Sequence, residues 1–198
     1  DNTARVTALQ EGTAVAGENI PFANSDQLVN AGVTVDSVSS YGIGFLMFNC
    51  QKEPFNDKRV RQAFFYAIDV QKLIDNIMAG HANPVKSFLP ENFANFHEAS
   101  NVYTYDPEKA KELFETAKAE LGKDTFTFDM VVDADDAPQK VAQVVKEQLE
   151  TTLEGLTINL TVEPKKQRVQ DMQDGTFELG LTRWGPDYAD PMTYLGMW

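Results

Sequence analysis

The second half of the chain alternates between two apolar periodicities, and this alternation constrains the fold more than any other feature. Apolar, aromatic and β-branched residues predict strands at 126–132, 156–162 and 177–184. Between them, residues 138–152 and 165–173 have the apolar spacing of helices. Strands that alternate with helices pair in parallel and are joined by right-handed crossovers. We therefore predict a βαβαβ unit and an α/β fold.

The first half of the chain is predicted to begin with short helices and strands. Helices are expected at 4–11 and 21–30, because each of these segments ends at a glycine. Strands are expected at 33–38 and 41–48, which are rich in β-branched and aromatic residues.

The clearest helical pattern follows these strands. Asp57 is expected to cap a helix whose apolar stripe runs from Val60 to Ile68. A second stripe runs from Val70 to Met78, and at 100° per residue the two stripes lie about 80° apart. One straight helix could not bury both stripes, so we predict a break at Asp69, which caps the second helix.

A loop at 81–101 separates this region from a further helix that starts at Asp106-Pro107 and stops at Gly122. The expected organisation is a single ligand-binding lobe over 1–198, in three parts: lead-in helices and strands (1–50), a helical region and loop (51–105), and a helix followed by the βαβαβ unit (106–198).

Composition excludes several classes of function. The chain has 198 residues and a formal net charge of −13. Nucleic acid and anionic membranes are therefore not expected as partners, because both require a basic face. No segment approaches the ~20 apolar residues of a membrane span. The single Cys50 excludes an internal disulfide.

Catalytic and metal-binding patterns are not found. His81 and His97 lack partners at metal-ligand spacing, and neither a dinucleotide fingerprint nor a phosphate loop is present. Asp187 and Asp190 could form a glycosidase pair, but Asp190 is already expected to cap a helix. We therefore expect no metal, no cofactor and no enzymatic activity.

The candidate site is the turn after the last predicted strand. Trp184, Gly185 and Asp187 follow that strand, and Asp190-Pro191 has the pattern of an N-cap and first helical position. Ligands of open α/β sheets bind beyond the carboxyl ends of strands. The alternative interpretation, from local sequence alone, is a Gly-Pro turn with one capping aspartate.

Three segments resemble one family. These are Phe48-Asn49 with 54–69, then 105–110, and finally 174–191 with its Trp-Gly-Pro-Asp turn. Together they resemble the oligopeptide- and dipeptide-class solute-binding proteins of ABC transporters, known as extracytoplasmic solute-binding protein family 5.

The resemblance implies one lobe of a periplasmic-binding-protein-like (type II) fold. The chain matches much of the second, C-terminal lobe, so the partner lobe is expected to be missing. Since the chain also stops at Trp198, one turn into a predicted helix, we expect it to be a piece of a longer protein. The implied protein is an extracytoplasmic receptor, periplasmic or a cell-surface lipoprotein, that delivers its ligand to an ABC permease.

The resemblance also implies roles for single residues. Asp187 would pair with the α-ammonium group of a peptide, Trp184 would line the cleft, and main chain near Gly185 would hydrogen-bond the peptide backbone. Arg59 and Arg61 are expected to be part of the scaffold. No basic residue is identified for the peptide carboxylate. Alternatives are a sugar, haem or nickel chelate as ligand, or, in a different class, a carboxylate-dependent glycoside hydrolase.

Overall fold

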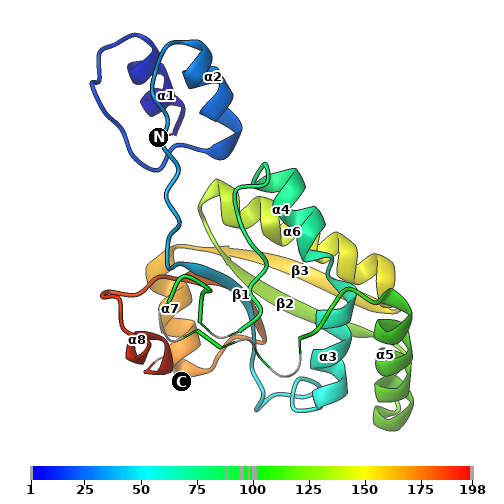
Figure 1. The fold of residues 1–198 in the computed structure, drawn as a ribbon. Helices are drawn as coiled ribbons and strands as arrows, with labels where there is room; N and C mark the ends of the chain where they lie inside the picture. The colour runs from blue at the N-terminus through cyan, green and yellow to red at the C-terminus, as the bar shows by residue number, and fades with distance from the viewer. Residues whose placement is uncertain (1, 88, 94–95, 98, 100–101, 197–198) are drawn as a thin grey trace.

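A mixed α/β architecture is built around a four-stranded sheet in the computed structural model, which describes residues 2–87, 89–93, 96–97, 99 and 102–196 (Figure 1). The strands are β1 (Ile43–Phe48), β2 (Phe126–Asp133), β3 (Leu156–Glu163) and β4 (Leu179–Trp184), in the spatial order β1-β4-β2-β3. β2 pairs in parallel with β3 and β4, whereas β1 pairs antiparallel with β4. The predicted βαβαβ unit is confirmed.

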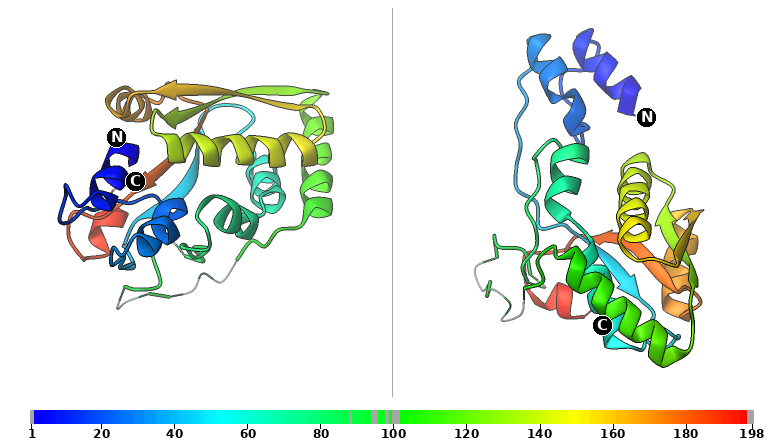
Figure 2. Two further views of the ribbon diagram at one scale, coloured as in Figure 1. Left: turned by 90° about the horizontal axis from the view of Figure 1, so that it is seen from above. Right: turned by 90° about the vertical axis from the view of Figure 1, so that its right-hand side faces the viewer.

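Helices cover both faces of the sheet (Figure 2). α6 (Asp136–Thr152) connects β2 to β3, and α7 (Lys165–Asp174) connects β3 back across β2 to β4. These two crossovers run in opposite directions, so right-handed connections place α6 and α7 on opposite faces.

The main core lies on the α6 face, where α3 (Lys58–Ala67) and α5 (Pro107–Leu121) also pack. Alternate residues of β2 point into it, and Met130 and Val132 are fully buried there. Aromatic side chains fill its centre: Phe55 lies 4.6 Å from Phe128 and 5.8 Å from Phe64, between ring centroids. This core joins α3, α5 and α6 to the sheet as one unit.

Helix boundaries follow the predicted capping residues. α3 is followed by α4 (Val70–Ile77), and the break falls at Asp69, whose carboxylate accepts a hydrogen bond from the Lys72 N–H at 3.1 Å. Asp106 caps α5 in the same way, through the Lys109 N–H at 3.0 Å. The predicted break and caps are confirmed.

The N-terminal segment has a separate apolar cluster. α1 (Asn2–Gln10) and α2 (Ser25–Asn30) lie apart from the sheet at the end of an extended segment (Figure 1, and Figure 2, right). The predicted helix at 21–30 is divided, because its first turn is the 3₁₀-helix η1 (Phe22–Asn24). The buried members of the cluster are Val6, Leu9 and Leu28.

The predicted strand at 33–38 is wrong, because the structure has no strand there. Val33 and Val35 pack against the N-terminal apolar cluster instead of pairing with a strand. Val38 is 87% exposed, so the second half of the segment buries no apolar surface. β-branched composition alone therefore mispredicted a segment that has no neighbouring sheet edge.

No helix in the described part of the chain is both long and apolar enough to span a membrane.

Candidate functional site

An open pocket of about 560 Å³ lies where β2 and β4 end, at Asp133 and Trp184. We call it the edge pocket. Its walls come from the segment before β1, from the β2 end, from the first turn of α7 and from the turn after β4. Because β2 and β4 are parallel, their carboxyl ends meet at this edge, which is the usual place for ligands in α/β sheets.

Trp184 is a half-buried wall of the edge pocket. Its ring packs against that of Tyr194 at 5.0 Å, in a T-shaped arrangement. Tyr194 is fully buried in α8 (Met192–Leu195), and its hydroxyl donates a hydrogen bond to the Tyr41 carbonyl. Burial raises the pKa of the Tyr194 phenol. Tyr194 therefore holds the Trp184 indole in place.

Gly185 is exposed and lines the edge pocket next to Trp184. A Cβ at Gly185 would lie 3.9 Å from the Gly42 Cα, and one at Gly42 would lie 3.7 Å from the Trp184 carbonyl oxygen. The two glycines thus bring the chain before β1 close to the chain after β4. Main chain, rather than side chain, forms this part of the wall.

Asp187 directly follows Pro186, a residue of the pocket wall, but is not itself part of that wall. Its side chain is exposed and has no hydrogen bond or ion pair within the described residues. Asp190 is engaged, because its carboxylate accepts a hydrogen bond from the Met192 N–H at 2.8 Å. Asp190 thus bonds the first N–H of α8 as predicted for a capping side chain, although Pro191 and not Asp190 occupies the N-cap position. Asp187 is the carboxylate of this turn that remains open to a ligand.

Charged residues that sequence reasoning missed complete the pocket wall. Arg168 on α7 is 4% exposed, and its Nε donates to Asp133 Oδ1 at 2.6 Å. Lys165 and Arg183 line the pocket beside this pair. The available sequence signal was Asp133, a carboxylate at the end of a buried strand, which requires a cationic partner.

Two further carboxyl groups interact with each other, Glu163 at the end of β3 and Asp171 on α7. Glu163, the last residue of β3, has its Oε2 buried without a hydrogen-bond partner in the described residues. Burial, together with a hydrogen bond to Asp171, raises the pKa of the Glu163 carboxyl.

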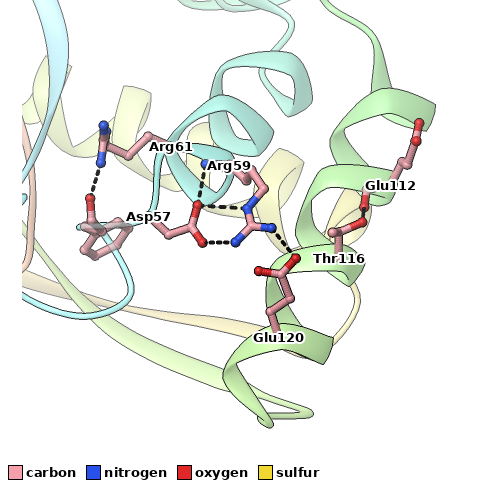
Figure 3. Close-up of polar contacts among 7 residues, drawn as sticks. Asp57, Arg59, Arg61, Glu112, Thr116 and Glu120 are labelled. Carbon is pink, nitrogen blue, oxygen red and sulfur yellow. Dashed lines mark hydrogen bonds and ion pairs between the residues drawn. The ribbon is translucent and has the colours of Figure 1, made fainter.

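An ion-pair chain links the start of α3 to α5 (Figure 3). Asp57 accepts from the Arg59 N–H at 2.8 Å and pairs with its guanidinium at 2.6 Å. The same guanidinium reaches Glu120 on α5, also at 2.6 Å, and Arg61 donates to the Phe55 carbonyl. The hydrogen bond from Arg59 lowers the pKa of the Asp57 carboxyl. Arg59 and Arg61 thus join α3 to its neighbours, as expected of scaffold residues.

Metal-ligating side chains do not gather in the structure: within the described ranges, no group of three or more His, Cys, Asp or Glu could hold a metal ion.

Comparison with known proteins identifies the family. The model of the bacterial extracellular solute-binding proteins, family 5 Middle, matches residues 1–198. The chain belongs to this family. Family 5 proteins are transport receptors and not enzymes.

Relatives in family 5 are named for different ligands. The chain is 35% identical to the dipeptide-binding protein of Lactococcus lactis over 146 residues, which is 69% of the chain and 26% of that protein. It is 27% identical to heme-binding protein A of Haemophilus influenzae over 201 residues, which is 98% of the chain and 36% of that protein. The chain therefore spans between about a quarter and just over a third of the length of these relatives.

Solved structures show the same fold. The oligopeptide ABC transporter substrate-binding domain of Bacillus anthracis has a TM-score of 0.82 and 27% identity, covering 99% of this chain and 40% of that one. The Helicobacter pylori periplasmic binding protein DppA, in complex with the peptide STSA, has a TM-score of 0.86 and 24% identity, covering 98% and 37%. The predicted type II periplasmic-binding-protein fold is confirmed.

Proposed function

We propose that the chain is a ligand-binding lobe of an extracytoplasmic receptor that binds dipeptides or oligopeptides and delivers them to an ABC importer. The observation that carries the proposal is the turn after β4. There, a half-buried indole (Trp184), exposed main chain (Gly185) and a carboxylate that has no partner among the described residues (Asp187) follow one another at the carboxyl edge of the sheet. The dipeptide- and oligopeptide-binding relatives support the same ligand class.

Each of these three groups suits one part of a peptide. A peptide α-ammonium group that is shielded from water requires a close carboxylate, which Asp187 supplies. Main chain at Gly185 can hydrogen-bond the peptide backbone whatever its side chains are. The indole of Trp184 offers a rigid apolar surface beside both groups.

The mechanism we propose is binding followed by closure of two lobes, with no covalent chemistry. The edge pocket is open, so a facing lobe from the remainder of the protein is needed to shield the ammonium–carboxylate pair from water. We expect the isolated chain to bind peptides weakly or not at all. Micromolar binding by the chain alone would contradict this mechanism.

A second candidate ligand is haem, because the relative from Haemophilus influenzae named heme-binding protein A aligns with nearly the whole chain. Haem has no α-ammonium group, so the account based on Asp187 does not apply to it. Titration of the full-length protein with hemin and with trialanine separates the two ligands.

The test is calorimetry on the full-length protein with trialanine. We expect Asp187→Asn to lower the affinity at least tenfold, since a shielded charge pair worth more than ~1.4 kcal/mol is lost. Asp190→Asn is the matched control, because asparagine also caps helices and the same turn loses one charge. N-acetylation of the peptide should weaken binding to the wild type by a similar factor. Unchanged affinity of the Asp187→Asn variant would overturn the proposed role.

A further inference from the structure

β3 is an edge strand, because the order β1-β4-β2-β3 ends with it. The Glu163 carbonyl accepts a hydrogen bond from the Ala134 N–H, on the β2 side of the strand. Since the main-chain groups of successive residues alternate between the two edges of a strand, Ile158, Leu160 and Val162 direct theirs outward. This outer edge pairs with no other strand in the described part of the chain.

Two side chains of α6 occupy the outward hydrogen-bonding groups of Ile158. Glu150 Oε1 accepts from the Ile158 N–H at 2.7 Å, and Lys146 Nζ donates to the Ile158 carbonyl at 2.5 Å. Lys146 and Glu150 also form an ion pair with each other, one helical turn apart. We call these two residues the edge clamp. The edge clamp supplies one acceptor and one donor, as a neighbouring strand would, so no strand can pair with Ile158 while it is closed.

Beyond Ile158, the outer edge of β3 is open. The outward main-chain groups of Leu160 and Val162 have no hydrogen-bond partner among the described residues. Leu160 lines an open groove of about 360 Å³ beside α6, and the Val162 side chain is 48% exposed. The edge is therefore accessible, but the edge clamp leaves a partner strand only the two outward-facing residues at its end.

The sequence of β3 favours self-association. Residues 156–162 are Leu-Thr-Ile-Asn-Leu-Thr-Val, with no charge, proline or glycine. Segments of six or seven residues with high β-propensity and no charge pair with copies of themselves when their edge is exposed. Edge strands commonly carry a lysine or a proline of their own that prevents this pairing. In this chain the charges at the β3 edge come from α6 instead.

We propose that the outer edge of β3 is a strand-addition surface for β3 of a second copy of this chain, and that the edge clamp keeps it closed. The occupant is the same strand of another copy, because an uncharged, β-branched edge pairs best with a strand of the same composition. Opening the edge clamp leaves the Ile158 N–H and carbonyl without partners and joins them to the open groups of Leu160 and Val162. A second strand satisfies all of these groups at once.

The experiment is sedimentation velocity of the full-length protein over a range of concentrations. The double variant Lys146→Ala/Glu150→Ala should self-associate at concentrations at least tenfold below any at which the wild type does. Lys140→Ala/Glu147→Ala is the matched control and should sediment like the wild type. It removes the same two charges from exposed positions of α6 that make no hydrogen bond to β3 in the described structure. Circular dichroism checks that each variant is folded.

Two further measurements locate the effect. Val162→Lys, added to the double variant, places a charge on the edge and should restore wild-type sedimentation. In the wild type, the Ile158 amide should exchange its hydrogen at least tenfold more slowly than the Leu160 and Val162 amides, and this result needs no substitution. Equal exchange at the three amides would overturn the edge clamp. Self-association of the double variant that matches the control, or that Val162→Lys leaves unchanged, would overturn the strand-addition surface.

Discussion

Single side chains at the start of α3 make several contacts each, and Asp57 is the clearest case. Its carboxylate caps the helix through the Arg59 N–H and also binds the Arg59 guanidinium, which continues to Glu120 on α5. The cap was predictable because it is local in sequence. The link to Glu120 was not, because it joins residues that only the packing of α3 on α5 brings together.

Replacement of Asp57 by alanine should lower the free energy of unfolding by about 1–2 kcal/mol, the usual range for loss of an N-cap. Urea titration measures this difference. Lys58→Ala, at the neighbouring exposed position, should change it by less than ~0.5 kcal/mol. Equal effects of the two substitutions would show that the cap contributes nothing.

The Asp57 carboxyl group should also make the free energy of unfolding depend on pH. Its pKa is lowered in the folded chain by the hydrogen bond from Arg59. A lowered pKa stabilises the fold above the ordinary aspartate value of about 4, and this stabilisation is lost as the pH falls through the folded value. The difference in unfolding free energy between wild type and Asp57→Asn should therefore shrink below pH 4. A difference that is constant from pH 7 to pH 2.5 would contradict this assignment.

At the scale of elements, the helix ends named above and the βαβαβ succession were predictable, but the strand at 33–38 was predicted wrongly. The break at Asp69 and the stop at Gly122 follow from capping chemistry within a few residues. The strand predicted at 33–38 is wrong because strand formation does not depend on local sequence alone. A strand needs a neighbouring edge, and residues far away in the sequence determine whether one is present.

Gly155, between α6 and β3, is the glycine that tolerates a side chain least. Its φ is +85°, and a Cβ there would lie 2.6 Å from the Asp124 carbonyl oxygen. Gly122 has φ +63° but open space around it. Gly155→Ala should therefore destabilise the chain by more than Gly122→Ala, which should cost about 1 kcal/mol for its backbone conformation alone. Thermal unfolding of both variants checks the order, and a larger loss at Gly122 would contradict it.

At the scale of the whole molecule, the buried apolar residues of the described chain form separate clusters, of which two matter here. The smaller one contains Val6, Leu9 and Leu28, and the larger one joins the sheet to α3, α5 and α6. The sequence did not predict this division, because each helix alone shows only that it has an apolar side. The expected single lobe over 1–198 stays a prediction.

Leu28→Ala tests the division. Leu28 is fully buried, so the substitution should cost about 2–5 kcal/mol within the smaller cluster. Hydrogen exchange should accelerate in α1 and α2 while β2 and α6 keep the protection of the wild type. Leu149→Ala, in the main core, is the control that should accelerate exchange in β2 and α6. Equal acceleration in both regions by Leu28→Ala would show one cooperative unit.

The candidate site was predictable only in part. Trp184, Gly185 and Asp187 are adjacent in sequence, so a motif places them together. Arg168 and Asp133 lie 35 residues apart, and the pocket that they share with Lys165 and Arg183 exists only once α7 has crossed the sheet.

The most direct test of the central claim is native mass spectrometry of the full-length protein purified without added ligand. A receptor that encloses its ligand between two lobes should carry some of it through purification. We predict bound masses that match short peptides, and their loss in the Asp187→Asn variant. A bound haem, sugar or metal chelate that Asp187→Asn leaves in place would contradict the account.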